Sequence, residues 1–221
     1  MEWVIILAKI LLINIVLSGD NAVVIAMASR HLPEAERKQA IWWGSLAAIG
    51  LRIVLVFVAV WLLQVPYLQA LGALMLMYIA IKLLDEEADG DARHELKKAA
   101  GLWSAVWTIL LADFVMSLDN VLAIAAIAKG HMLLIMLGVL LSIPLIVWGS
   151  SLIVRLLDKY PILIVIGAAI LGYTAGEMLL GDHKLQEWVA RMPHHIHLTI
   201  PILCTLFALI PGMLKLRKAG H

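Results

Sequence analysis

The sequence contains few charged residues and only one cysteine. Asp, Glu, Lys and Arg make up 15% of the 221 residues and hydrophobic residues 63%, whereas a soluble domain has about a quarter charged residues. This shortage of charge argues against a soluble fold. The lone Cys204 excludes an intrachain disulfide bond and a Cys-x-x-Cys redox pair. The sequence contains neither a nucleotide-binding loop nor a nucleophile–base pair that would indicate an enzyme. The net charge of +1 gives no indication of a nucleic-acid partner.

The sequence is instead dominated by long apolar runs. Several approach or exceed the roughly 18–20 residues that cross a bilayer as a helix. We expect the first run to stay in the protein rather than act as a cleaved signal, because it begins with Glu2 and contains an aspartate. The pattern predicts an all-α polytopic membrane protein with seven transmembrane helices, at 3–29, 38–63, 67–84, 102–128, 131–154, 161–180 and 198–216.

The basic residues predict the orientation of these helices. With the N-terminus outside, eleven basic residues fall in the inner loops and tail and three in the outer loops, which satisfies the positive-inside rule. We therefore expect an N-out, C-in protein. The inner set is Arg30, Arg37, Lys38, Arg93, Lys97, Lys98, Arg155, Lys159, Lys215, Arg217 and Lys218, and the outer set is Lys129, Lys184 and Arg191.

Two stretches ninety-nine residues apart are nearly the same: LSGDNAVVIA at 17–26 and MSLDNVLAIA at 116–125. With a shift of 95, the third and sixth spans also align, Tyr78 on Tyr173 and Lys82 on Glu177, whereas the second and fifth align poorly. Chance matching of apolar residues is the alternative, but the polar matches favour a repeat.

The repeat unit has three spans, so its second copy must cross the membrane in the opposite sense. This is the inverted-repeat plan of secondary transporters, whose binding site lies near the midplane. The predicted segments are 1–84, the first three-helix repeat; 85–101, a cytoplasmic acidic loop; 102–181, the second, inverted repeat; and 182–221, an outer segment, the seventh helix and a basic tail.

Charged side chains inside the predicted spans indicate a cation site. An aspartate at the centre of a span costs roughly 2.5–3.5 kcal/mol on insertion scales, so something must compensate it. Four acids face one deeply placed base, Arg52, and the excess negative charge favours a cation as ligand. The four acids are Asp20, Asp113, Asp119 and Glu177.

Depth along the helices predicts which groups meet. At about 1.5 Å per residue, Asp20 and Asp113 lie on the inner side of the midplane, and Asp119 pairs with Asn14 on the outer side. Asp113, Ser117 and Asn120 share one helix face. We expect Arg52 to bond a motif aspartate or backbone carbonyls, and to replace the cation when the site is empty.

The donor types predict the kind of cation. Carboxylate, amide and hydroxyl oxygens suit Mg²⁺, Ca²⁺ or Mn²⁺, and no histidine or cysteine among them would indicate zinc or copper. Met116 is a soft donor beside the second motif, but packing is the simpler interpretation. No prosthetic group is expected. The predicted metal ligands are Asp20, Asn21, Asp113, Asp119 and Asn120, with Asn14, Ser18, Ser117, Arg52 and Glu177 in support.

The duplicated motifs, LSGDNAVVIA and ADFVMSLDNVLAIAAI, together with GYTAGEM in the sixth span, resemble the TerC family of bacterial integral membrane proteins. The resemblance covers about residues 3–216. It implies a place in the bacterial cytoplasmic (inner) membrane, Mn²⁺ as the favoured substrate, and export as the direction. The residues themselves indicate only a hard divalent cation that is translocated.

Two other functions stay open at this stage. One is an exporter of a small organic cation or amino acid, although the sequence offers no aromatic cage for an amine. The other is a non-transporting membrane subunit that loads metal onto secreted proteins or scaffolds a stress complex. The small-residue seam of Gly172 and Gly176 fits either packing within the chain or a homodimer.

Overall fold

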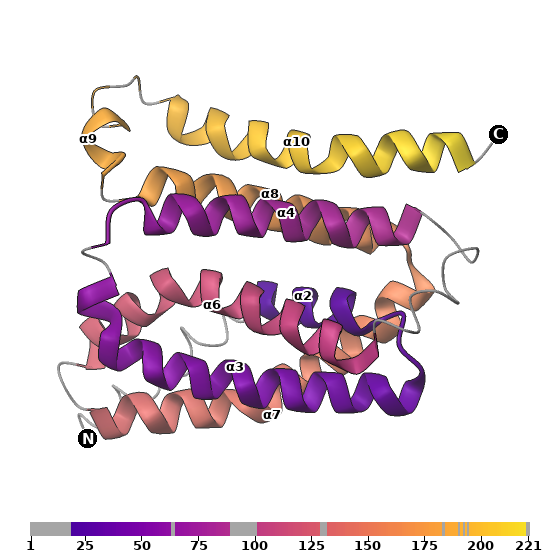
Figure 1. Cartoon of the computed structure of the whole chain (residues 1–221), viewed down its shortest axis with the longest axis horizontal. Helices are drawn as coiled ribbons and strands as arrows, with labels where there is room; N and C mark the ends of the chain where they lie inside the picture. Colours follow the sequence, from indigo (N-terminus) through magenta and orange to yellow (C-terminus); the bar gives the residue numbers. More distant parts are fainter. Residues whose placement is uncertain are drawn as a thin grey trace. The chain divides into compact units, whose positions relative to one another are not determined.

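The computed structural model describes residues 19–62, 65–88, 101–128, 132–182, 184–189, 191, 193 and 195–219. Within these ranges every regular element is a helix (Figure 1). A chain in hydrocarbon must satisfy its backbone groups internally, and helices do so within one segment. The helices are α2 (Gly19–Ser29), α3 (Glu34–Leu62), α4 (Leu68–Ala88), α6 (Gly101–Ala128), α7 (Met132–Lys159), α8 (Ile162–Gly181), α9 (Gln186–Val189) and α10 (Ile196–Ala219).

Four of the described helices are long and apolar enough to cross a membrane. Their qualifying stretches are Glu34–Val58, Leu68–Asp85, Gly101–Leu118 and Ile162–Gly181, and α10 adds a shorter apolar stretch, Ile196–Pro211. These helices coincide with the second, third, fourth, sixth and seventh predicted spans, and α7 covers the fifth. The all-α membrane class is therefore confirmed. Most of the predicted first span lies outside the described residues.

Two helices extend past their predicted boundaries. Helix α4 continues to Ala88, four residues past the predicted end of the third span, before the undescribed part of the acidic loop. In the described part of the outer segment, α9 is a four-residue helix, Gln186–Val189, and Trp188 within it is exposed. Helix α3 begins earlier than predicted, at Glu34, where Pro33 precedes it and the acidic first turn suits the positive end of the helix dipole.

The chain divides into two compact units that do not follow its order. Unit 1 comprises Met1–Trp61 and Leu102–Leu156, and unit 2 comprises Leu62–Gly101 and Leu157–His221. Each unit draws helices from both predicted three-helix repeats. The two units are defined by contacts, whereas the predicted repeats are defined by symmetry, so the units do not test the repeats. The predicted segments 1–84, 85–101, 102–181 and 182–221 therefore stay predictions.

In unit 1, α3 and α6 run parallel to each other. Ala40 clusters with Ala105 and Val106. One helical turn further along, a Cβ added at Gly44 would lie 2.8 Å from Ile109 Cδ1. The two helices keep this register over two further turns, where the polar groups of the candidate site meet. Glycine at 44 thus allows the close approach that brings the site's two helices together.

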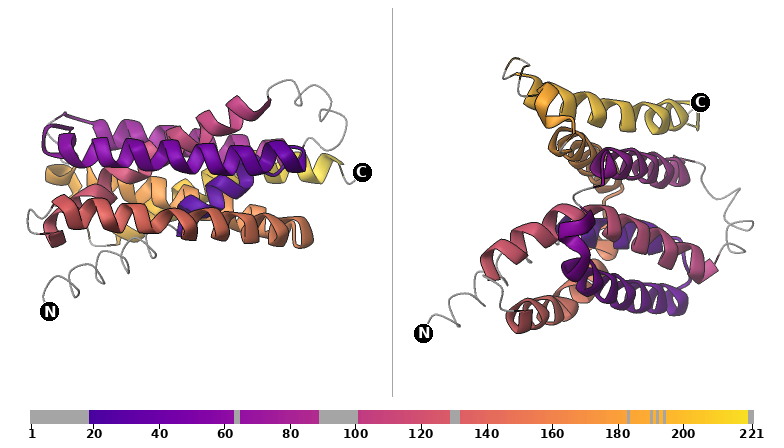
Figure 2. Two further views of the ribbon diagram at one scale, coloured as in Figure 1. Left: turned by 90° about the horizontal axis from the view of Figure 1, so that it is seen from below. Right: turned by 60° about the vertical axis from the view of Figure 1, so that its left-hand side comes forward.

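In unit 2, α8 packs antiparallel against both α4 and α10, as Figures 1 and 2 show. A Cβ at Gly172 would lie 2.9 Å from Thr205 Cα, and one at Gly176 would strike the backbone of Pro201. The Gly172–Gly176 seam is therefore filled by α10 of the same chain. This finding selects packing within the chain over a dimer as the role of the seam.

Candidate cation site

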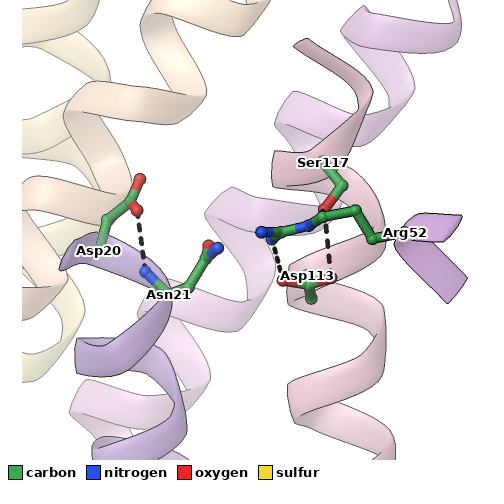
Figure 3. Close-up of polar contacts among 5 residues, drawn as sticks. All are labelled: Asp20, Asn21, Arg52, Asp113 and Ser117. Atoms are coloured by element: carbon green, nitrogen blue, oxygen red, sulfur yellow. Dashed lines mark hydrogen bonds and ion pairs between the residues drawn. The ribbon is translucent and has the colours of Figure 1, made fainter. Parts of the chain in front are cut away.

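The most deeply buried charge is Arg52, on α3 in unit 1. It is 1% exposed and the largest of the fully buried side chains among the described residues. Its Nη2 donates to Asp113 Oδ1 at 2.6 Å and its Nε donates to Ser117 Oγ at 3.0 Å (Figure 3). Arg52 was expected to bond a motif aspartate or backbone carbonyls; the aspartate that it bonds is Asp113, six residues before Asp119 of the second motif.

Asp113 and Ser117 lie one turn apart on α6 and complete a closed network with Arg52. Ser117 Oγ donates to Asp113 Oδ2 at 3.1 Å, so the predicted shared face is confirmed for these two residues. Asp113 is 6% exposed and Ser117 is fully buried. Removing one partner of such a buried pair costs about 3–5 kcal/mol. The network therefore fixes α3 against α6.

Asn21 brings a polar group to this network from α2. It is 2% exposed, and neither its Oδ1 nor its Nδ2 has a hydrogen-bond partner among the described residues. A buried polar group left unsatisfied costs about 1–3 kcal/mol. In Figure 3, Asn21 lies between Asp20 and the Arg52–Asp113 pair. An amide held in this way is well suited to a ligand that can pair with its oxygen.

A small cavity separates α2 from α6 at this point. The cavity has a volume of about 10 Å³, which is close to the smallest volume that holds one water. Such a space fits a single water or a bare metal ion, and is far too small for an amino acid. The cavity is lined by Asn21, Val24, Ile25, Ile109, Ala112, Asp113 and Met116.

Asp20 adds a second carboxylate near the cavity. Its Oδ1 accepts the Asn21 N–H at 2.8 Å, and it is close enough to Arg52 and Asp113 to interact electrostatically with both. Depth along the helices predicted that Asp20 and Asp113 lie together, and the structure confirms it. Two carboxyl groups and one guanidinium meet here, so acidic groups outnumber basic ones by one, which favours a cation.

The remaining predicted residues are not brought to this cavity in the described structure. Asn14 and Ser18 lie outside the described residues, and so do the side chains of Asp119 and Asn120, although α6 continues through them. Glu177 lies on the exposed side of α8, in unit 2. Across the described ranges, no three His, Cys, Asp or Glu side chains cluster as a metal site. The set Asp20, Asn21, Asp113, Asp119 and Asn120 therefore stays a prediction as a ligand set.

Met116 packs in the buried core, in agreement with the simpler interpretation, and it also reaches the cavity. It is 4% exposed and lines the same cavity as Asn21 and Asp113. Its place at the cavity could be anticipated, since Met116 follows Asp113 by three residues, a spacing that puts both on one face of a helix. Hydrophobicity alone could not distinguish a methionine that lines a polar cavity from one that fills the core.

These features define a polytopic helical membrane protein with a buried, ionisable site inside one of its units. The chain belongs to the Integral membrane protein TerC family, whose profile it matches over residues 1–219. The resemblance seen in the motifs is thus confirmed over nearly the whole chain.

Several bacterial membrane proteins are similar to this chain. It is 44% identical over 212 residues to the membrane protein YjbE of Bacillus subtilis, covering 96% of this chain and 95% of YjbE. It is 29% identical over 199 residues to YkoY of the same organism, covering 82% of this chain and 61% of YkoY. The inner membrane protein YgdQ of Escherichia coli is 22% identical over 170 residues, 70% of this chain and 71% of YgdQ. No solved structure gives a significant match.

Proposed function

We propose that the protein is a transporter that exports a divalent metal cation, Mn²⁺ first among them, across the bacterial inner membrane. The observation that carries the proposal is the amide of Asn21, which has no hydrogen-bond partner among the described residues and lines a cavity that also borders Asp113. Oxygen donors of these types suit Mn²⁺. The preference for Mn²⁺ and the outward direction rest on membership of the TerC family. The metal is cargo, and no catalytic role or prosthetic group is proposed.

The proposed architecture is seven spans, N-out and C-in, with spans 1–3 related to spans 4–6 by a two-fold axis in the membrane plane. Two packing features support it. The parallel α3 and α6 are the second and fourth spans, and the antiparallel α4 and α8 are the third and sixth. Accessibility labelling tests the topology: residue 90 and the C-terminus should both react from the cytoplasmic side. Labelling from opposite sides would contradict it.

The size of the cavity favours a metal over the competing organic cation or amino acid. Space for one water-sized sphere accepts a bare ion but excludes an amino acid in this conformation. A non-transporting subunit for metal loading or stress complexes would bind metal without moving it. Flux measurements are therefore needed alongside binding measurements.

Proteoliposomes provide the decisive experiment. Purified protein in vesicles that contain a Mn²⁺-sensitive dye should carry Mn²⁺ down an imposed gradient, and Asp20→Asn protein should carry much less at equal protein content. Lysine and arginine as competitors test the amino-acid alternative. Mn²⁺ binding without flux would support the non-transporting subunit, and neither binding nor flux would overturn the metal proposal.

A further inference from the structure

Three groups of different chemistry border the cavity between α2 and α6. The amide of Asn21 and the carboxylate of Asp113 supply oxygen, and Met116 supplies a thioether sulfur. The other lining residues, Val24, Ile25, Ile109 and Ala112, have no heteroatom in their side chains. The residues that line the cavity therefore include one with a side-chain sulfur beside two with side-chain oxygens.

The two oxygen-bearing groups retain capacity for a ligand. Asn21 Oδ1 has no hydrogen-bond partner among the described residues although the residue is 2% exposed. Asp113 bonds Arg52 through one oxygen and Ser117 through the other. Each carboxylate oxygen has two lone-pair sites, so one bond on each leaves room for a cation. Thus both groups can contact an ion placed in the cavity.

Methionine can reach such an ion because it is unbranched and has three rotatable side-chain bonds. Met116 is 4% exposed, so its sulfur has little access to solvent, and the cavity lies beside it. Mg²⁺ and Ca²⁺ take oxygen ligands and gain little from a thioether, whereas softer ions bind it. A thioether on the wall therefore favours softer divalent ions over hard ions of equal size.

From this geometry we infer that Met116 determines specificity: it makes the site prefer a transition-metal ion such as Mn²⁺, or the softer Cd²⁺, over Mg²⁺ and Ca²⁺. The inference rests on the proposed function and deepens it, since it states how a site of few charges would exclude the abundant hard ions. It also identifies a ligand other than the Asp and Asn residues of the duplicated motifs.

The comparison of Cd²⁺ with Ca²⁺ isolates this effect, because the two ions share charge and have nearly the same radius and differ in softness. Isothermal titration of the purified full chain should show tighter binding of Cd²⁺ than of Ca²⁺. In Met116→Leu the affinity for Cd²⁺ should fall at least about tenfold, the lower range for losing a group that supports a metal site. The affinity for Mn²⁺ should fall by less, and that for Ca²⁺ should not change.

Met27→Leu is the matched control. Met27 is equally buried, at 4% exposure, and lies on α2 in unit 1, but it does not line the cavity. Its replacement should leave all three affinities unchanged. If Met116→Leu behaves like Met27→Leu, or lowers the affinities for Cd²⁺ and Ca²⁺ equally, Met116 is a packing residue and the inference is wrong.

A second measurement needs no variant. The ¹¹³Cd NMR resonance of the wild-type protein should lie downfield of the range for all-oxygen sites, because sulfur ligands shift it in that direction. A resonance in the all-oxygen range would overturn the inference while leaving the metal proposal intact. If the wild-type protein binds neither Cd²⁺ nor Mn²⁺, both fail.

Discussion

The two units of the chain bury different kinds of residue. Of the nine buried polar or charged residues in the described ranges, eight lie in unit 1 and only Asp182 lies in unit 2. Unit 2 instead packs through small residues, with Gly172 and Gly176 against α10. Buried polar groups in a membrane protein are costly and mark functional sites. The contrast assigns the chemistry to unit 1 and a packing role to unit 2.

Asp182, the buried polar residue of unit 2 among the described residues, has a structural role. Asp182 follows α8 and accepts hydrogen bonds from Ala70 N at 3.1 Å and Lys184 N at 2.9 Å. It thereby satisfies a backbone donor in the first turn of α4, which has no intrahelical partner of its own. Asn21 in unit 1 is the opposite case, a buried polar group with no partner among the described residues. Comparable variants in the two units should therefore have different consequences.

The largest loss of stability is expected for Asp113→Asn. The change leaves the Arg52 charge buried without its carboxylate, and a guanidinium does not lose its proton in proteins. The cost is about 3–5 kcal/mol, which should appear as a large drop in monodisperse protein on size-exclusion chromatography and in Tm. Arg52→Gln should cost less, because a carboxylate left alone can take up a proton.

The double variant Asp113→Asn/Arg52→Gln is the control for this prediction. It removes both charges and should recover most of the folded yield that Asp113→Asn loses. A double variant no better than Asp113→Asn would show that the ion pair is not what holds α3 against α6.

A smaller loss is expected in unit 2 for Gly176→Ala. The added methyl group would strike the backbone of Pro201 on α10, and overpacking of this kind typically costs about 1–3 kcal/mol. The Tm should fall, while the protein that remains folded should bind Mn²⁺ with unchanged affinity. Gly149→Ala is the control, since a Cβ there meets nothing within 4 Å. Weaker Mn²⁺ binding by folded Gly176→Ala protein would contradict the division of roles.

Asp182→Ala should cost less again. It removes the hydrogen bond from Ala70 N that joins the end of α8 to the start of α4, and the local bond from Lys184 N. The loss of a helix cap costs typically about 1 kcal/mol. The expected result is a modest fall in Tm with normal Mn²⁺ flux. Asp182→Asn keeps one acceptor oxygen and should fall between Asp182→Ala and wild type. A loss of flux without a loss of stability would place function in unit 2.

Much of this organisation follows from the sequence, for identifiable reasons. Length and hydropathy predict the spans, because the bilayer sets the length of a crossing helix. The pairing of Arg52 with an acid follows from the cost of an isolated charge. The partition into two units does not follow, since helices that are apolar on all sides carry no periodicity to show which face packs. For the same reason, the sequence does not predict that α10 packs against the Gly172–Gly176 seam.

The smallest effect on stability is expected for Asp20→Asn, and it separates function from folding most clearly. Asp20 does not bond Arg52 among the described residues, and it lies half-buried beside the cavity rather than inside the Arg52–Asp113–Ser117 network. Neutral Asn is also cheaper to place in a membrane than Asp, so Tm and yield should match wild type. Asn keeps one oxygen to accept the Asn21 N–H, so the local backbone bond can persist.

Binding should nevertheless weaken in Asp20→Asn, because the site loses one of its two carboxyl groups while the cavity keeps its shape. We expect Mn²⁺ affinity to fall about tenfold or more, the effect of about 1.4 kcal/mol, and protection of cells from excess Mn²⁺ to be lost. Asp119→Asn should act in the same way if the second motif supplies the other half of the path. Asp113→Asn would differ from both by failing at the folding step. Unchanged Mn²⁺ affinity in both Asp20→Asn and Asp119→Asn would leave the duplicated motif with a structural role only.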